Sequence, residues 1–87
     1  MKKPCLMLMM MKAEVRLGEY QHYKGKFYRV IGVARHSEDS SQEFVVYRAL
    51  YKTEFGEGSL WIRPKDMFLE NVVVDDEEVP RFRFVGD

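Results

Sequence analysis

The chain has 87 residues, which is enough for one small domain and too few for two. Fourteen basic residues balance fourteen acidic ones, so the formal net charge is zero and strong non-specific affinity for nucleic acid is not implied. The single cysteine, Cys5, excludes an internal disulfide and favours a reducing, cytoplasmic setting.

The first residues, MKKPCLMLMMM, place two lysines before a short apolar run. The run is much shorter than the ~20 residues of a membrane span. No small-residue cleavage site follows it, which argues against a secretory signal. We therefore predict that residues 1–12 are a disordered leader or precede the true start, and that residues 13–87 form a single small β-barrel domain.

The strongest strand signals lie in the first half of the domain. Residues 15–23 are predicted to form an entry strand, and Gly25 is expected to adopt a positive φ in the turn that follows. Residues 26–36 form the longest predicted strand, in which Gly32 is the expected place for a bulge. A polar loop at 37–41 then leads into a second long strand at 43–51, and the two strands are expected to pair as a central hairpin.

The second half contains shorter elements. Residues 52–59 are predicted to be a flexible connection, followed by a strand at 60–63 and one helical turn over Pro64–Phe68. A strand at 70–74, an acidic turn at 75–78 and a last strand at 79–85 complete the chain, and Pro80 favours an edge position for that last strand. This pattern predicts an all-β fold, specifically a small SH3-like antiparallel β-barrel of five to six strands with one short helical turn.

Four sequence blocks carry a family resemblance. They are GEYQHYKGKFYRVIGVARHSE, FVVYRALY, LWIRPKDMFLENV and VPRF, and they follow one another from about Gly18 to Phe84. Together they closely resemble the short bacterial proteins of domain of unknown function 1653. The resemblance implies a shared fold and no activity, because the family name records that none is assigned. The methionine-rich leader and the longer 52–59 connection depart from the family pattern.

The sequence contains no strong catalytic or metal motif. The segment Gly56-Glu57-Gly58 lacks the spacing and the following Lys-Ser/Thr of a phosphate-binding loop. His22, His36 and Cys5 do not have the spacing of a zinc site, so neither a metal nor a cofactor is predicted. His36 and Ser37 would point to opposite faces of a strand, so His36 is badly placed to activate its neighbour as a nucleophile.

Aromatic and cationic side chains near the strand ends are the best candidates for a binding surface. Small β-barrels use such side chains to bind peptides, anions or single-stranded nucleic acid. We predict a non-enzymatic binding or interaction module of unknown ligand. Its candidate ligand-binding residues are His22, Tyr23, Arg35, His36, Tyr47, Trp61 and Arg63.

Three other readings stay open. In the first, the rings build the core and Arg35 and Arg63 form ordinary salt bridges with nearby glutamates. In the second, the protein is a small metabolite-acting enzyme or accessory domain. His36 or His22 would then act as acid–base, with Arg35 and Arg63 binding an anion. In the third, the Val79–Val85 edge strand pairs with its twin, so that the partner is a second copy in a weak homodimer. No membrane partner is predicted.

Overall fold

A computed structural model of the chain describes residues 14–87, and the predicted leader lies outside this range. The backbone forms a five-stranded antiparallel sheet in the order β10-β2-β3-β4-β7. Its strands are β2 (Gly18–His22), β3 (Phe27–His36), β4 (Asp39–Ala49), β7 (Leu60–Pro64) and β10 (Phe82–Gly86). The prediction of an all-β fold is confirmed.

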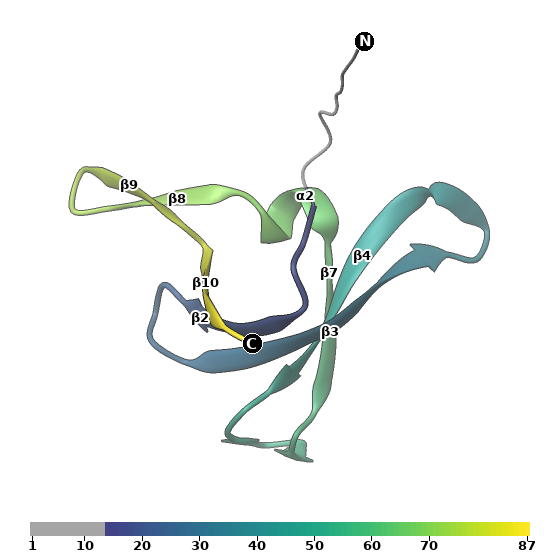
Figure 1. The fold of residues 1–87 in the computed structure, drawn as a ribbon, viewed down its shortest axis with the longest axis horizontal. Coiled ribbons are helices and arrows are strands. Elements are labelled where there is room, and N and C mark those ends of the chain that lie inside the picture. The colour runs from purple at the N-terminus through teal and green to yellow at the C-terminus, as the bar shows by residue number, and fades with distance from the viewer. Residues whose placement is uncertain (1–13) are drawn as a thin grey trace, which may run out of the picture.

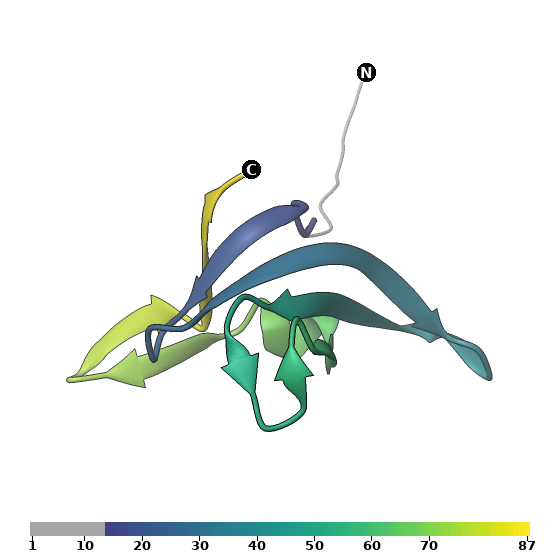
Figure 2. The ribbon, with the colours of Figure 1, turned by 90° about the horizontal axis from the view of Figure 1, so that it is seen from below.

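The sheet is strongly curved and open. In Figure 2 the strands β2, β3 and β4 form an arch, with the short helix α2 (Lys65–Phe68) beneath it. The last strand, β10, returns to pair with the first, β2, as in a small barrel. The two edge strands, β7 and β10, do not pair with each other within residues 14–87, so the small β-barrel is not closed.

Two small hairpins extend from the sheet. One consists of β5 (Lys52–Thr53) and β6 (Gly56–Glu57), and the other of β8 (Asn71–Val74) and β9 (Glu77–Pro80). The β8–β9 hairpin and the end of the β3–β4 hairpin project on opposite sides of the molecule (Figure 1). The predicted flexible connection at 52–59 therefore contains a short hairpin.

Local sequence signals locate several turns correctly. Gly25 has φ of 110°, and the ladder between β3 and β4 shifts register between Val30 and Gly32, as the predicted bulge requires. The loop between these strands is shorter than predicted, because β4 already begins at Asp39. Asp39 accepts hydrogen bonds from the backbone N–H and the hydroxyl of Ser41 and from Gln42, and these bonds order the start of the strand.

The predicted last strand, 79–85, divides into two strands with different partners. The change occurs at Arg81, whose N–H donates to the Glu70 carbonyl and whose carbonyl accepts from the Tyr23 N–H. Residues before Arg81 pair with β8, and residues after it pair with β2. The acidic turn is also tighter than predicted. It comprises only Asp75 and Asp76, both with positive φ, as a two-residue hairpin turn requires.

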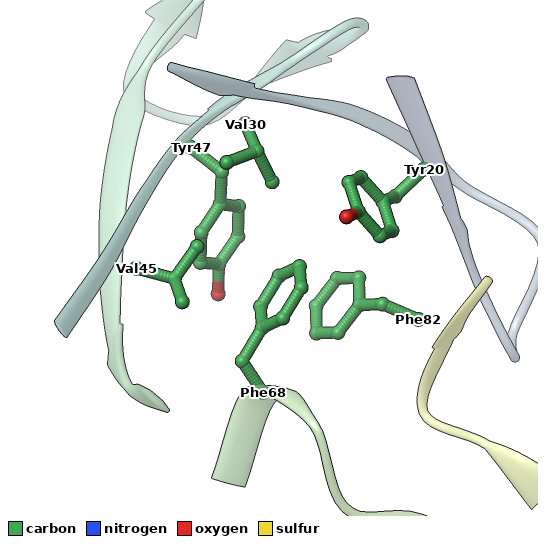
Figure 3. Close-up of a cluster of buried hydrophobic side chains, with 6 residues drawn as sticks. All are labelled: Tyr20, Val30, Val45, Tyr47, Phe68 and Phe82. Atoms are coloured by element: carbon green, nitrogen blue, oxygen red, sulfur yellow. The ribbon is translucent and has the colours of Figure 1, made fainter. Parts of the chain in front are cut away.

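The hydrophobic core lies under the concave face of the sheet. Helix α2 contributes Phe68, which is 1% exposed and stacks on Phe82 with ring centroids 4.2 Å apart. The core cluster shown in Figure 3 consists of Tyr20, Val30, Val45, Tyr47, Phe68 and Phe82. A four-residue helix has little stability of its own, so burial of its phenylalanine is what holds it against the sheet.

Candidate functional site

Strand register brings several polar side chains to the same side of the sheet as the core. Residues opposite each other in an antiparallel pair point to the same face. Arg63 of β7 lies opposite the buried Val45, and His22 of β2 lies opposite the buried Phe82. Arg63 and His22 therefore both project to the concave side, although β3 and β4 separate their strands in the sheet order.

Arg63 is half-buried against an aromatic ring. Its guanidinium carbon lies 5.4 Å from the centroid of the Phe82 ring, within the range of a cation–π interaction. It forms no salt bridge and no side-chain hydrogen bond with residues 14–87, whereas Arg29, Arg35 and Arg81 each face a carboxylate. The five N–H donors of Arg63 thus have no partner within the part of the chain that the structure describes.

His22 contacts the same ring. Its imidazole packs edge-on against Phe82 at 4.9 Å between centroids, and its Nδ1 accepts the backbone N–H of Lys24 at 3.2 Å. Burial lowers the pKa of His22, and the positive charges of Arg63, Lys24 and Arg81 lower it further. The ring is therefore neutral near pH 7. Because Nδ1 is the acceptor, Nε2 carries the proton and is a hydrogen-bond donor.

Tyrosine hydroxyls complete the polar part of the cluster. Tyr28 and Tyr51 share a hydrogen bond of 2.6 Å, and Lys26 Nζ lies 4.6 Å from the centre of the Tyr51 ring. Burial raises the pKa of Tyr28, and the bond to Tyr51 raises it further, so the Tyr28 hydroxyl stays protonated at neutral pH. Tyr47 is only 4% exposed, yet its hydroxyl makes no hydrogen bond with the described residues. A buried hydroxyl of this kind normally has a partner, so water or a ligand is expected beside it.

We call this group, defined as His22, Tyr28, Tyr47, Tyr51, Arg63 and Phe82, the Arg63 cluster. It contains one permanent positive charge, and the structure places no carboxylate of residues 14–87 against that charge. Tyr28, Tyr51 and Phe82 are not among the residues predicted for the site from the sequence. The alternation of Phe82 and Phe84 in the sequence marks them as facing one side of a strand, but it does not show that Arg63 lies over Phe82.

The other predicted site residues lie apart from this cluster. Arg35 pairs with Glu43 at 3.4 Å and donates to the Ser40 carbonyl at 2.8 Å, so the salt-bridge reading holds for Arg35. His36 is exposed near the end of the β3–β4 hairpin, where its Nδ1 accepts the N–H of Glu38 at 3.1 Å. The structure therefore does not bring Arg35 and His36 together with Arg63.

Tyr23 and Trp61 lie outside the Arg63 cluster but next to its residues. Tyr23 packs against the His22 ring, with centroids 4.6 Å apart, and lines a cleft of about 410 Å³ between the β8–β9 hairpin and the end of β2. Trp61 faces the concave side opposite Tyr47, but it is 37% exposed and contacts Phe55 of the β5–β6 turn.

Residues 14–87 show neither a side-chain cluster typical of a metal site nor a membrane-spanning helix. No group of three or more histidine, cysteine or acidic side chains there is arranged to hold a metal ion. The described part of the chain also contains no helix long and apolar enough to cross a membrane.

The fold and sequence agree with one known family. Residues 18–84 match the model of a protein family of unknown function, DUF1653. The chain belongs to the DUF1653 family. The crystal structure of a DUF1653 protein from Bordetella bronchiseptica superposes with a TM-score of 0.74 at 34% sequence identity, covering 84% of this chain and 90% of the other. No curated protein matches the sequence. DUF1653 membership confirms the resemblance seen in the sequence blocks and assigns no activity.

Proposed function

We propose that this protein is a binding module for a small oxyanion, a carboxylate or phosphate group, held at the Arg63 cluster. The observation that carries the proposal is the half-buried Arg63, which has no carboxylate partner among residues 14–87. A guanidinium presents parallel N–H groups that fit a carboxylate or phosphate bidentately. The neighbouring His22 Nε2–H supplies a further donor of the same polarity.

The aromatic surroundings favour this ligand class. Rings beside Arg63 reduce local screening by water, which strengthens an interaction between the guanidinium and an anion. The unpartnered Tyr47 hydroxyl lies on β4, diagonal to Arg63 in the strand register, and can donate to the same ligand. These three potential donor groups, the Arg63 guanidinium, the His22 Nε2–H and the Tyr47 hydroxyl, face no carboxylate among residues 14–87 and favour an anionic ligand over a cationic peptide.

The hydrogen bonding of His22 favours binding over proton transfer. Its Nδ1 already accepts the Lys24 N–H, and its Nε2 is protonated in the neutral ring. A general base needs a free lone pair directed at the substrate. His22 in this state offers a donor instead, which suits an anion that is held without being transformed.

Titration of the isotope-labelled protein tests the proposal. We expect inorganic phosphate, citrate and a mononucleotide, added separately at constant ionic strength, to shift the His22 and Arg63 side-chain signals. Arg63→Gln should weaken binding of the best ligand by about tenfold or more, since one charge-assisted bidentate contact is lost. Arg63→Lys keeps the charge but not the planar donor pair. Its affinity for the ligand should lie between those of the unchanged protein and Arg63→Gln.

Arg48→Gln is the matched control. Arg48 lies on the outer face of the sheet and, like Arg63, has no carboxylate partner among the described residues. Its guanidinium donates to the Gly58 carbonyl. We expect its replacement to leave binding unchanged. Equal weakening by Arg48→Gln and Arg63→Gln would show general charge attraction and refute the site. The absence of shifts with all three anions would refute the function.

A further inference from the structure

The edge strand β7 has an open hydrogen-bonding side. It pairs with β4 and with no other strand of residues 14–87. The Ala49 N–H donates to the Ser59 carbonyl at 2.9 Å, so Ala49 and Ser59 are a hydrogen-bonded pair at the end of the β4–β7 ladder. Because hydrogen-bonded pairs alternate along an antiparallel ladder, Trp61 and Arg63 direct their backbone groups at β4. Leu60, Ile62 and Pro64 direct theirs away from the sheet.

This edge also exposes apolar side chains. Leu60 is 55% exposed and Ile62 is 63% exposed, on the face opposite Trp61 and Arg63. Edge strands usually carry charges, bulges or prolines that discourage pairing with another chain. The other edge, β10, has such features in Arg83 and in a register shift between Phe84 and Gly86. On β7 these features are limited to Pro64 at its end and the inward-facing Arg63, and the outward backbone groups of Leu60 and Ile62 stay open to pairing.

We propose that a second copy of this chain pairs with β7, antiparallel and around a two-fold axis at Ile62. Strand β7 runs from Leu60 to Pro64, so an axis at its centre gives full overlap of the two strands. Ile62 then exchanges both backbone hydrogen bonds with its twin. Each Leu60 N–H donates to the Pro64 carbonyl of the second copy. Proline has no N–H to donate back to the Leu60 carbonyl, so one hydrogen bond per copy is missing. The other bonds of this register are unaffected.

The side chains of this register are complementary. Trp61 of each copy lies opposite Arg63 of the other, in the pair type without hydrogen bonds, where side chains come closest. The indole face and the guanidinium then form two symmetric cation–π contacts. Ile62 meets its twin on the outer face, which covers the most exposed apolar side chain of the strand. The net charge of zero removes long-range repulsion between copies.

The proposed dimer goes beyond the proposed function and does not depend on it. It would place Trp61 of the second copy beside the Arg63 cluster, so that each anion site gains an aromatic wall from its partner. It also differs from the pairing through Val79–Val85 predicted from sequence, because that segment is divided between β9 and β10.

Sedimentation velocity of the full chain over a range of micromolar concentrations tests the association. We expect a monomer–dimer equilibrium. Its dissociation constant should rise about tenfold or more in Ile62→Lys, because the two lysines would lie side by side where the two β7 strands pair. Val73→Lys is the matched control, since Val73 is 71% exposed on the β8–β9 hairpin and away from β7. We expect it to leave the dissociation constant unchanged. A monomer at every concentration, or equal weakening by both variants, would overturn the proposal.

Oxidative crosslinking tests the register independently of affinity. In a Cys5→Ser background, Ile62→Cys should form a disulfide-linked dimer, because a two-fold axis at position 62 brings the two Cα atoms within about 6 Å. Leu60→Cys should not, since the two copies of position 60 lie four residues apart in this register. Faster crosslinking through position 60 than through position 62 would overturn the proposed axis.

Discussion

Replacement of Phe68 tests whether helix α2 is what holds the curved sheet together. Phe68 is 1% exposed, stacks on Phe82 at 4.2 Å, and meets Tyr20 and Tyr47 with centroids 5.3 and 5.7 Å away. Truncating a buried phenylalanine to alanine costs about 3 to 5 kcal/mol of unfolding free energy. The three contacting rings belong to β10, β2 and β4, which are fixed in the sheet and cannot collapse together into the space. We therefore expect a cost near 4 kcal/mol for Phe68→Ala.

That cost is large for a domain of this size. Eighty-seven residues correspond to a total stability of about 4 to 13 kcal/mol, so Phe68→Ala is expected to lie close to unfolding at room temperature. Phe68→Leu keeps most of the apolar volume and should cost about 1 to 1.5 kcal/mol. This corresponds to a fall in Tm of about 4 to 12 °C.

Thermal and urea unfolding followed by circular dichroism measure both variants. Phe55→Ala is the control, because Phe55 is 68% exposed in the turn between β5 and β6 and its loss should cost no more than about 0.5 kcal/mol. If Phe68→Ala were no more destabilising than Phe55→Ala, α2 would not be anchored in the core. The helix would then not be what holds the curved sheet together.

Two further predictions concern the Arg63 cluster. The pKa of His22 is lower in the folded chain than its unfolded value, so the unfolded state binds more protons and stability should fall as pH drops below about 6.5. The fall in Tm between pH 7.5 and 5.5 should shrink in His22→Gln but persist in His36→Gln; an unchanged pH dependence in His22→Gln would count against the assignment. Loss of the bond between Tyr28 and Tyr51, 2.6 Å long, should cost about 1 kcal/mol in either Tyr→Phe variant. The double variant should lose clearly less than the sum of the two, and full additivity in the thermodynamic cycle would mean that the bond contributes nothing.

Much of the fold could be predicted because its signals are local. The alternation of side chains in residues 26–36 and 43–51 identifies two half-buried strands, since successive residues of a strand face opposite sides. Gly25 marks a turn that needs positive φ, and Pro64 ends a strand just before the helical turn at Lys65–Phe68. Each of these features depends on neighbouring residues alone.

The division of the segment 79–85 could not be predicted in this way. Its residues continue to look like one strand, yet Arg81 is hydrogen-bonded to Glu70 on one side and Tyr23 on the other. Those two partners lie in other segments of the chain, and the change from one to the other depends on where the tertiary structure puts β8 and β2. Whether the sheet closes likewise depends on whether its two edge strands, β7 and β10, pair with each other. That is a property of the tertiary structure and not of neighbouring residues.

The sequence by itself determined the residue types of the site, whereas the tertiary structure decided which of them meet. His22, Arg63 and Phe82 are far apart along the chain and come together because β2 pairs with β10 while β4 pairs with β7. The same pairing places Arg35 opposite Glu43, with which it forms a salt bridge, and leaves Arg63 opposite Val45 without a carboxylate among residues 14–87. Two arginines that look equivalent in the sequence thus have different environments, because strand register determines which side chains lie opposite each other.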